Sequence, residues 1–169
     1  MIRAFAALIG LLSLGLVGGT ALASAAIGGS ATGAAFVKPV THSWISQGFG
    51  CTSYAFEPVD QACPGGHWHS GIDLAAARGT PVVATLPGTV TVIVSATGYG
   101  LHVVIDHGGG LSTLYGHLDT VIVANGTYVA SGQVIGTMGS SGNATGPHLH
   151  FEIRRDGIAE DPRQDVALP

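Results

Sequence analysis

The sequence contains eight histidines, and four of them fall in two short runs. The first run, HWHSGID, places a carboxylate four positions after an imidazole, at His69 and Asp73. The second run, HLHFE, places His148 and His150 two positions apart. Imidazole and carboxylate groups are ligands for Zn²⁺, and catalytic zinc sites commonly use three protein ligands and leave one position open. The two runs together therefore indicate a metal site, although H-x-x-x-D alone occurs in many proteins.

The second run predicts a β-strand, because apolar residues alternate with polar ones from His148 to Ile153. Alternate side chains of a strand lie on the same face, so His148, His150 and Glu152 are expected to share one face. The apolar residues between them are expected to be buried on the other face. Alternation does not say which histidine binds a metal, and a surface strand with two exposed histidines remains the alternative.

Three histidines outside these runs, and His67 within the first run, have less informative surroundings. His117, in the segment YGHL, would by itself be interpreted as a surface or hydrogen-bonded residue, and so would His107 before a glycine-rich turn. His67 is close enough to His69 to bind a stray metal, but it is interpreted as a loop residue. His102 is expected to be an exposed strand histidine.

Short runs rich in Val, Thr and Ile, separated by Gly and Pro, predict strands, and no run after the N-terminal segment shows a helical period. GGG at 108–110 predicts a hairpin turn. A loop is expected at 51–68, and the tail after Arg155 is expected to cross the surface irregularly. The sequence thus predicts an all-β, antiparallel domain, with strands at 43–46, 81–85, 89–94, 101–106, 111–115, 127–129, 133–137 and 148–154.

The N-terminus has the pattern of a secretory signal peptide. Arg3 precedes an apolar run at 4–17, and the small residues Ala23-Ser24-Ala25 fit an A-x-A cleavage site, with 21–23 as a second possibility. An uncleaved membrane anchor is the alternative, but the second half of the segment is weakly apolar for a span. The expected organisation is a signal peptide at 1–25, an Ala/Gly-rich linker at 26–41, one domain at 42–162 and a tail at 163–169.

Export would place the only two cysteines, Cys51 and Cys63, in an oxidising compartment, where a disulfide between them is expected. Metal ligation by these thiols is the alternative, but they lack the C-x-x-C spacing.

The charge balance excludes one class of partner. The formal net charge is −4, and removal of Arg3 with the signal peptide leaves five basic and ten acidic residues, a balance of −5. A nucleic-acid partner is not expected, because the sequence has no basic stripe. Hydrophobic residues make up 46% of the chain, which is enough to fill a core.

The motifs in their order resemble the lysostaphin-type, or LytM-like, zinc endopeptidases, which cut peptides of peptidoglycan. The resemblance extends over about residues 66 to 153 and is carried by the segments HSGIDLAAARGTPVVAT, GTVTVIV, GYGLHVVIDHGGG, LYGHL and GQVIGTMGSSGNATGPHLHFE. It implies a compact antiparallel β fold, a barrel-like sandwich of the duplicated hybrid motif type, with an open groove that holds the metal. It also implies a bacterial envelope or secreted enzyme that acts on peptidoglycan peptides. We expect a monomer that is not inserted in the membrane after signal cleavage.

The resemblance also implies roles for individual residues. His69, Asp73 and His150 match the ligands of one Zn²⁺ per chain. His148 matches a general base, and His117 matches a second catalytic histidine that orients water or stabilises the transition state. Glu152 is then a candidate for supporting the site or the fold rather than for the base.

Two features depart from the family pattern. Leu101 stands where relatives often have Asn, and the segment that holds the two cysteines has no counterpart that can be placed, although it is a candidate wall of the groove. A non-catalytic domain of the same fold that binds the wall or activates a hydrolase is the alternative function. A peptidase that acts on ordinary proteins is a third.

Overall fold

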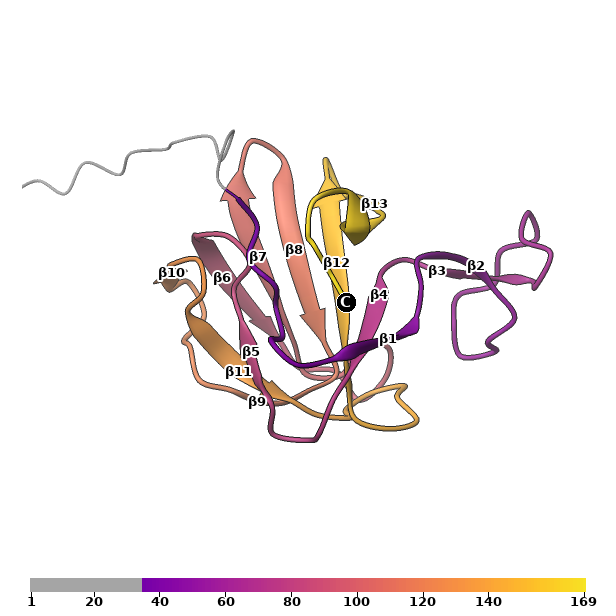
Figure 1. Ribbon diagram of the computed structural model, residues 1–169, viewed down its shortest axis with the longest axis horizontal. Coiled ribbons are helices and arrows are strands. Elements are labelled where there is room, and N and C mark those ends of the chain that lie inside the picture. The colour runs from indigo at the N-terminus through magenta and orange to yellow at the C-terminus, as the bar shows by residue number, and fades with distance from the viewer. Residues whose placement is uncertain (1–34) are drawn as a thin grey trace, which may run out of the picture.

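The computed structural model describes residues 35–169, and within this range the chain forms antiparallel β-sheets and one 3₁₀ turn at Pro162–Gln164 (Figure 1). The expected signal peptide at 1–25, with both of its possible cleavage sites, lies outside the described residues. Residues 35–169 contain no helix with the length and apolar character that crossing a membrane requires. The predicted fold class, all-β and antiparallel, is confirmed.

The largest sheet has eight strands and joins segments that are far apart in the sequence. From one edge to the other it contains β1 (Trp44–Gln47), β4 (Ile72–Ala75), β12 (His148–Arg155), β8 (Leu111–Gly116), β7 (His102–Gly108), β6 (Gly88–Ile93) and β10 (Tyr128–Val129). β13 (Ile158–Glu160) pairs with β12 beside this path. β12 contains His148 and His150 of the second run, and β4 contains Asp73 at the end of the first run. These two strands are neighbours in the sheet.

Two smaller sheets complete the described part of the fold. The first contains β5 (Pro81–Val83), β11 (Val134–Met138) and β9 (Leu118–Val121). The second pairs β2 (Gly50–Thr52) with β3 (His67–His69) and extends away from the large sheet, as Figure 1 shows.

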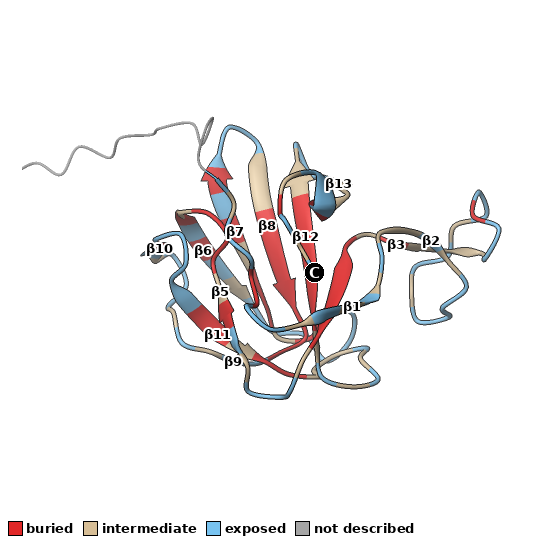
Figure 2. Cartoon of the chain, viewed as in Figure 1, coloured by how far each residue is buried: buried red, intermediate tan, exposed pale blue. Residues whose placement is uncertain are grey.

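One hydrophobic core joins the large sheet to the three-stranded sheet. The apolar face of β12 is entirely buried, since Leu149, Phe151 and Ile153 are 0% exposed, as the alternation predicted (Figure 2). Ile135 and Met138 from β11 are also 0% exposed and belong to the same core. Each such side chain stabilises the fold by about 1.5–3 kcal/mol relative to an exposed position. The core therefore holds β12 with its polar face turned to the opposite side.

The structure contains strands that sequence periodicity did not predict. β4 was missed because its four residues are too few to establish a period, and β9 was also missed. The tail after Arg155 was expected to be irregular, but Ile158–Glu160 forms β13 on the edge of β12. Asp156 and Gly157 join these two strands with φ values of 51° and 81°, which is typical of the Asp-Gly hairpin turn. The loop expected at 51–68 is shorter in the structure, because its two ends belong to the paired strands β2 and β3, and His67, expected as a loop residue, lies in β3.

The packed domain also extends beyond the expected boundaries of 42 and 162. Val40 is 1% exposed and Val166 is 2% exposed, and both belong to the core. Backbone hydrogen bonds from Val37 N–H to Thr85 and from Val83 N–H to Pro39 attach the residues before β1. The described end of the expected linker and the C-terminal tail are therefore parts of the folded unit.

The hydroxyl of Tyr115 is a buried junction between segments. Tyr115 is 0% exposed, and its hydroxyl oxygen accepts a hydrogen bond from the Thr85 backbone N–H at 2.8 Å. The same oxygen lies 2.9 Å from the hydroxyls of both Thr85 and Thr113. Removing this oxygen would leave the buried N–H of Thr85 without its acceptor.

We therefore predict that Tyr115→Phe lowers the free energy of unfolding by about 1–3 kcal/mol, the usual cost of an unsatisfied buried donor. Tyr128→Phe is the matched control, because Tyr128 is 68% exposed and should change stability by less than about 0.5 kcal/mol. Denaturant unfolding of the two variants and the wild type measures the difference. Equal stability of both variants would contradict the structural role of this hydroxyl.

Candidate metal centre

The register between β4 and β12 places two of the expected ligands opposite each other. In this antiparallel pair Asp73 is the partner of His150, and Leu74 is the partner of Leu149. Because neighbouring residues point to opposite faces, the same pairing that buries the leucines brings Asp73 and His150 together on the other face.

His69 reaches the same place through a tight connection between β3 and β4. This connection is Ser70-Gly71, and a Cβ atom at Gly71 would lie 2.5 Å from the carbonyl oxygen of Phe151 and 2.8 Å from His150 Nε2. Only glycine can therefore occupy position 71 without displacing β12. Gly71 does not have a positive φ, so the requirement for glycine comes from this close approach and not from the backbone conformation.

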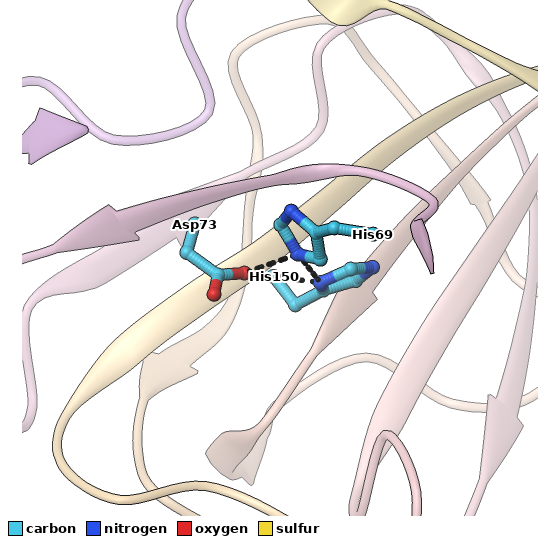
Figure 3. A group of neighbouring side chains, drawn as sticks. All are labelled: His69, Asp73 and His150. Carbon is cyan, nitrogen blue, oxygen red and sulfur yellow. Dashed lines mark hydrogen bonds and ion pairs between the residues drawn. The ribbon is translucent and has the colours of Figure 1, made fainter. Parts of the chain in front are cut away.

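Three ligand atoms from these residues form a nearly equilateral triangle (Figure 3). His69 Nε2 lies 3.1 Å from Asp73 Oδ1 and 3.0 Å from His150 Nδ1, and His150 Nδ1 lies 3.0 Å from Asp73 Oδ1. Zn²⁺ with bonds of about 2.0–2.1 Å in tetrahedral geometry separates its ligand atoms by roughly 3.3 Å, so the triangle fits a metal after a small expansion. The three residues are 0%, 7% and 3% exposed in the order His69, Asp73 and His150.

The hydrogen bonds of the two imidazoles leave the correct nitrogens free for a metal. His69 Nδ1 lies 2.7 Å from the carbonyl oxygen of Gly48 and donates its proton there, so Nε2 is left with a lone pair. His150 Nε2 lies 2.9 Å from Glu152 Oε1 and donates there, so Nδ1 is left with a lone pair. These two nitrogens face Asp73 Oδ1, to which they donate hydrogen bonds when they carry a proton, so a metal that binds between them replaces those protons. This donor set matches two neutral histidines and one carboxylate on a cation.

Charge interactions within this group shift pKa values. Burial opposes ionisation of Asp73, but hydrogen bonds from His150 and His69 outweigh burial and hold the pKa of Asp73 well below its usual range. Burial likewise opposes the charge on His150, but its hydrogen bonds to Asp73 and Glu152 raise the pKa of His150 to about 9. The carboxylates therefore attract positive charge into the space between the three ligands.

Glu152 is completely buried behind His150 and is surrounded by donors. Its Oε1 accepts hydrogen bonds from Ser70 Oγ at 2.6 Å, Tyr99 Oη at 2.7 Å and His150 Nε2 at 2.9 Å, and its Oε2 accepts from Arg154 Nε. Burial opposes ionisation, but the hydrogen bond from His150 and the other donors lower the pKa of Glu152 to about 2. An ionised carboxylate in this position fixes both the tautomer and the orientation of the ligand imidazole.

His148 and His117 lie beside the triangle without belonging to it. Their ring centroids are 4.7 Å apart, and His148 Nε2 lies 3.6 Å from Asp73 Oδ2. Backbone carbonyls hold the Nδ1 atom of each ring, Gly146 for His148 at 2.9 Å and Ser141 for His117 at 2.7 Å. In the neutral form each ring therefore has an unprotonated Nε2. Burial lowers the pKa of His117 to about 4, with a further contribution from His148, so His117 is neutral near pH 7.

The triangle opens into a groove with two hollows. One has a volume of about 320 Å³ and is lined by Phe56, Glu57, Pro58, Ser70, Gly98, Tyr99, His117, Asn143 and His150. The other has a volume of about 270 Å³ and is lined by Ser46, Gln47, Tyr54, Glu57, Asp73, His117, Asn143, Thr145 and His148. Three residues, Glu57, His117 and Asn143, line both hollows, so the hollows adjoin. Each hollow also reaches one ligand of the triangle, His150 in the first and Asp73 in the second.

The sequence missed several residues of this groove. Tyr99 and Glu57 come from loops, where no periodicity indicates a role. Ser70 lies inside the HWHSGID run, and its place beside two expected metal ligands could have indicated a role in the site. The segment that contains the two cysteines was a candidate wall of the groove, and its residues do line both hollows. The structure also contains the expected disulfide between Cys51 and Cys63.

The remaining histidines lie elsewhere. His102 was expected to be exposed, but it is only 8% exposed, and its Nδ1 lies 2.9 Å from the carbonyl oxygen of Gly100. That prediction was wrong because its strand, β7, lies between β6 and β8 within the sheet. His107 is hydrogen-bonded to Pro87 and Thr113, and His67 Nδ1 lies 2.7 Å from the carbonyl oxygen of Glu57. Leu101, at the position where Asn was noted in relatives, packs against the core.

Known proteins share both the sequence and the fold. The model of Peptidase family M23 matches residues 67–162. The DD-carboxypeptidase/endopeptidase Mpg of Neisseria meningitidis is 42% identical over 135 residues, which are 79% of this chain and 29% of Mpg. The murein hydrolase activator EnvC of Escherichia coli is 43% identical over 93 residues, which are 55% of this chain and 22% of EnvC. The chain thus spans less than a third of the length of these curated relatives.

Solved structures agree with the sequence comparison. A zinc-containing peptidase from Vibrio cholerae superposes with a TM-score of 0.65 and 33% identity, covering 80% of this chain and 41% of that one. The catalytic domain of lysostaphin from Staphylococcus simulans gives a TM-score of 0.59 and 32% identity, covering 72% of this chain and 90% of that one. Motif order, ligand geometry, family match and fold all lead to the same conclusion: the chain belongs to peptidase family M23.

Proposed function

We propose that this protein is a zinc endopeptidase that hydrolyses peptide bonds of peptidoglycan outside the cytoplasm. The observation that carries the proposal is the complete ligand triangle, with two further imidazoles beside it and two adjoining hollows that reach it. The names of relatives support the substrate class, because Mpg is a DD-carboxypeptidase/endopeptidase and ShyB of Vibrio cholerae is a peptidoglycan DD-endopeptidase, 42% identical over 85 residues. The proposed bond is accordingly a cross-link between D-residues.

In this proposal His69, Asp73 and His150 hold one Zn²⁺. Bound zinc polarises a carbonyl group and lowers the pKa of a bound water toward ~7. The protein's own contribution begins with Glu152, which holds the Nε2 proton of His150 and so keeps Nδ1 directed at the metal position.

His148 is proposed as the general base. Its Nδ1 is held by the carbonyl of Gly146, and its Nε2 lies within 3.6 Å of the ligand Asp73, close to the position where water would be activated. A neutral imidazole in this position can accept the proton of the attacking water and later deliver it to the leaving amine.

His117 is proposed to orient the attacking water. Because its Nδ1 proton is held by Ser141 and its pKa is lowered to about 4 by burial, the ring offers Nε2 as an acceptor near pH 7. An acceptor can hold a water proton but cannot donate a hydrogen bond to a developing oxyanion. The geometry therefore favours water orientation over transition-state stabilisation for this residue.

A location outside the cytoplasm agrees with the disulfide between Cys51 and Cys63, since disulfides persist in oxidising compartments. The expected signal peptide would lead to the same location. The one-domain organisation and the monomeric state remain parts of this proposal.

The activity test uses purified protein and isolated peptidoglycan. We predict that the protein releases soluble muropeptides, loses this activity with a chelator and regains it with Zn²⁺. His148→Ala should lower kcat/KM by about 10²–10⁴-fold, the usual contribution of a general base. His42→Ala is the matched control, because His42 is exposed and lies outside both hollows. An unimpaired His148→Ala variant would refute the mechanism.

A second function is favoured by one comparison, the identity of 43% with the murein hydrolase activator EnvC. A non-catalytic activator would release no muropeptides without a partner hydrolase, so the same assay distinguishes the two functions. Mass spectrometry of the released muropeptides identifies the bond. Cleavage of casein but not of peptidoglycan would instead indicate a peptidase of ordinary proteins.

The role of Glu152 gives a prediction that is independent of activity. Glu152→Gln retains the shape of the side chain but removes the charge that orients His150, so Zn²⁺ affinity should fall by about 10–100-fold. Competition with a chromophoric chelator measures this affinity. Glu160→Gln is the matched control, because Glu160 forms its ion pair with Arg155 on the surface. Equal affinities of the two variants would contradict the support of His150 by Glu152.

A further inference from the structure

The backbone at His117 departs from the strand that leads to it. β8 ends at Gly116, β9 begins at Leu118, and His117 joins them with a φ of 58°. Among residues 35–169, the only other non-glycine residue with a positive φ is Asp156, in the hairpin turn between β12 and β13. Such a conformation persists only where the surrounding contacts impose it, and it is concentrated at functional sites.

This conformation decides the side of the sheet on which the His117 ring lies. Tyr115 faces the core, and Gly116 faces the ligand triangle as the partner of His150. If the strand continued, alternation would direct His117 toward the core, on the face of Tyr115. Instead the His117 ring lies beside that of His148, with centroids 4.7 Å apart, and lines both hollows. The left-handed backbone therefore brings this ring to the groove.

Ser141 contacts both the backbone of this junction and the imidazole. Its hydroxyl accepts a hydrogen bond from the Leu101 N–H at 2.9 Å and donates one to the Leu118 carbonyl at 2.8 Å. The Leu118 N–H donates to the Leu101 carbonyl at 2.9 Å, so Ser141 completes a closed group of hydrogen bonds between these two residues. The Ser141 carbonyl oxygen accepts a hydrogen bond from His117 Nδ1 at 2.7 Å.

The turn before β7 packs directly against Ser141. A Cβ atom at Gly100 would lie 2.4 Å from Ser141 Oγ, and Gly100 has a φ of 64°, so both the space and the conformation require glycine there. The neighbouring Tyr99 carbonyl accepts a hydrogen bond from the His117 N–H at 2.8 Å. The Ser141 hydroxyl is the side-chain member of this set of contacts, and Ser141 lines neither hollow.

We propose that the Ser141 hydroxyl is a positioning group for His117, which holds the junction between β8 and β9 in the left-handed conformation that turns the imidazole toward the metal centre. Ser141 touches no substrate in this proposal and acts only through His117. The catalytic consequence rests on the proposed function, in which His117 orients the attacking water, but the placement of the ring does not depend on that function.

The test is Ser141→Ala, which removes both hydrogen bonds of the hydroxyl, and Ser141→Thr is the conservative variant that keeps the hydroxyl. Ser131→Ala is the matched control, because it also removes a hydrogen bond from a serine hydroxyl to a backbone carbonyl, that of Thr85 at 3.0 Å, and lies outside both hollows. The first readout is the nuclear Overhauser effect between the rings of His117 and His148 in the Zn²⁺-loaded protein. The others are Zn²⁺ affinity, and kcat and KM on a short cross-linked muropeptide at saturating Zn²⁺.

A displacement of the His117 ring by about 1 Å would lower kcat by up to about 10²-fold and would weaken the Overhauser effect by about threefold. We therefore expect Ser141→Ala to weaken the Overhauser effect and to lower kcat by about tenfold or more, with KM and Zn²⁺ affinity changed by less than about twofold. Ser141→Thr and Ser131→Ala should match the wild type. In a His117→Ala background, Ser141→Ala should lower kcat by less than about twofold further, because residues that act as a unit are not additive.

Full additivity of the two substitutions would overturn the proposal, because Ser141 would then act without His117. A loss of Zn²⁺ affinity in Ser141→Ala would also overturn it, since that loss would indicate general damage to the site, and so would an unchanged Overhauser effect. A wild type that releases no muropeptides would refute the proposed function, while the Overhauser effect would still decide whether Ser141 positions His117.

Discussion

The pairing of β4 with β12 is the constraint on which the rest of the site depends. Asp73 and His150 face each other only in the observed register, and a slip of one strand by one residue would turn its ligand toward the core. What prevents the slip is the opposite face, where Leu74 and Leu149 are 0% exposed. The apolar core thus specifies the ligand geometry, and Gly71 completes it by letting the preceding turn approach β12.

Hydrogen bonds make the buried charges of this site compatible with a stable fold. Arg154 and Tyr99 bind Glu152, Glu152 binds His150, and His150 lies against Asp73. Each buried polar atom in this series has a partner, so none carries the full cost of desolvation. In this series the half-buried Arg154 positions Glu152, and Glu152 positions His150, which is a member of the ligand triangle. A substitution of Arg154 should therefore change the affinity for a metal, although Arg154 is not one of the three ligands.

Alternation along a strand was the most reliable sequence signal. It predicted the face shared by His148, His150 and Glu152, because apolar and polar residues alternate along this strand and so record its two faces directly in the sequence. It failed for β4, whose four residues are too few to establish a period, and it did not show that neighbouring strands cover His102. It was also silent about Glu57, since a loop has no period and its return to the site depends on tertiary contacts. The choice of His150 over His148 as ligand came from resemblance and is matched by the triangle of donor atoms.

The charge of the groove bears on how an acidic protein could act on an anionic polymer. The formal net charge of the chain is −4, and among the described residues that line the two hollows none is Lys or Arg. Glu57 and Asp73 make the groove acidic until a cation binds. For the proposed peptidoglycan substrate, net charge therefore supplies no long-range attraction, and contact would be made through uncharged or cationic parts of its peptides. One wall of this groove is the segment closed by the disulfide between Cys51 and Cys63, which contributes Tyr54, Phe56 and Glu57.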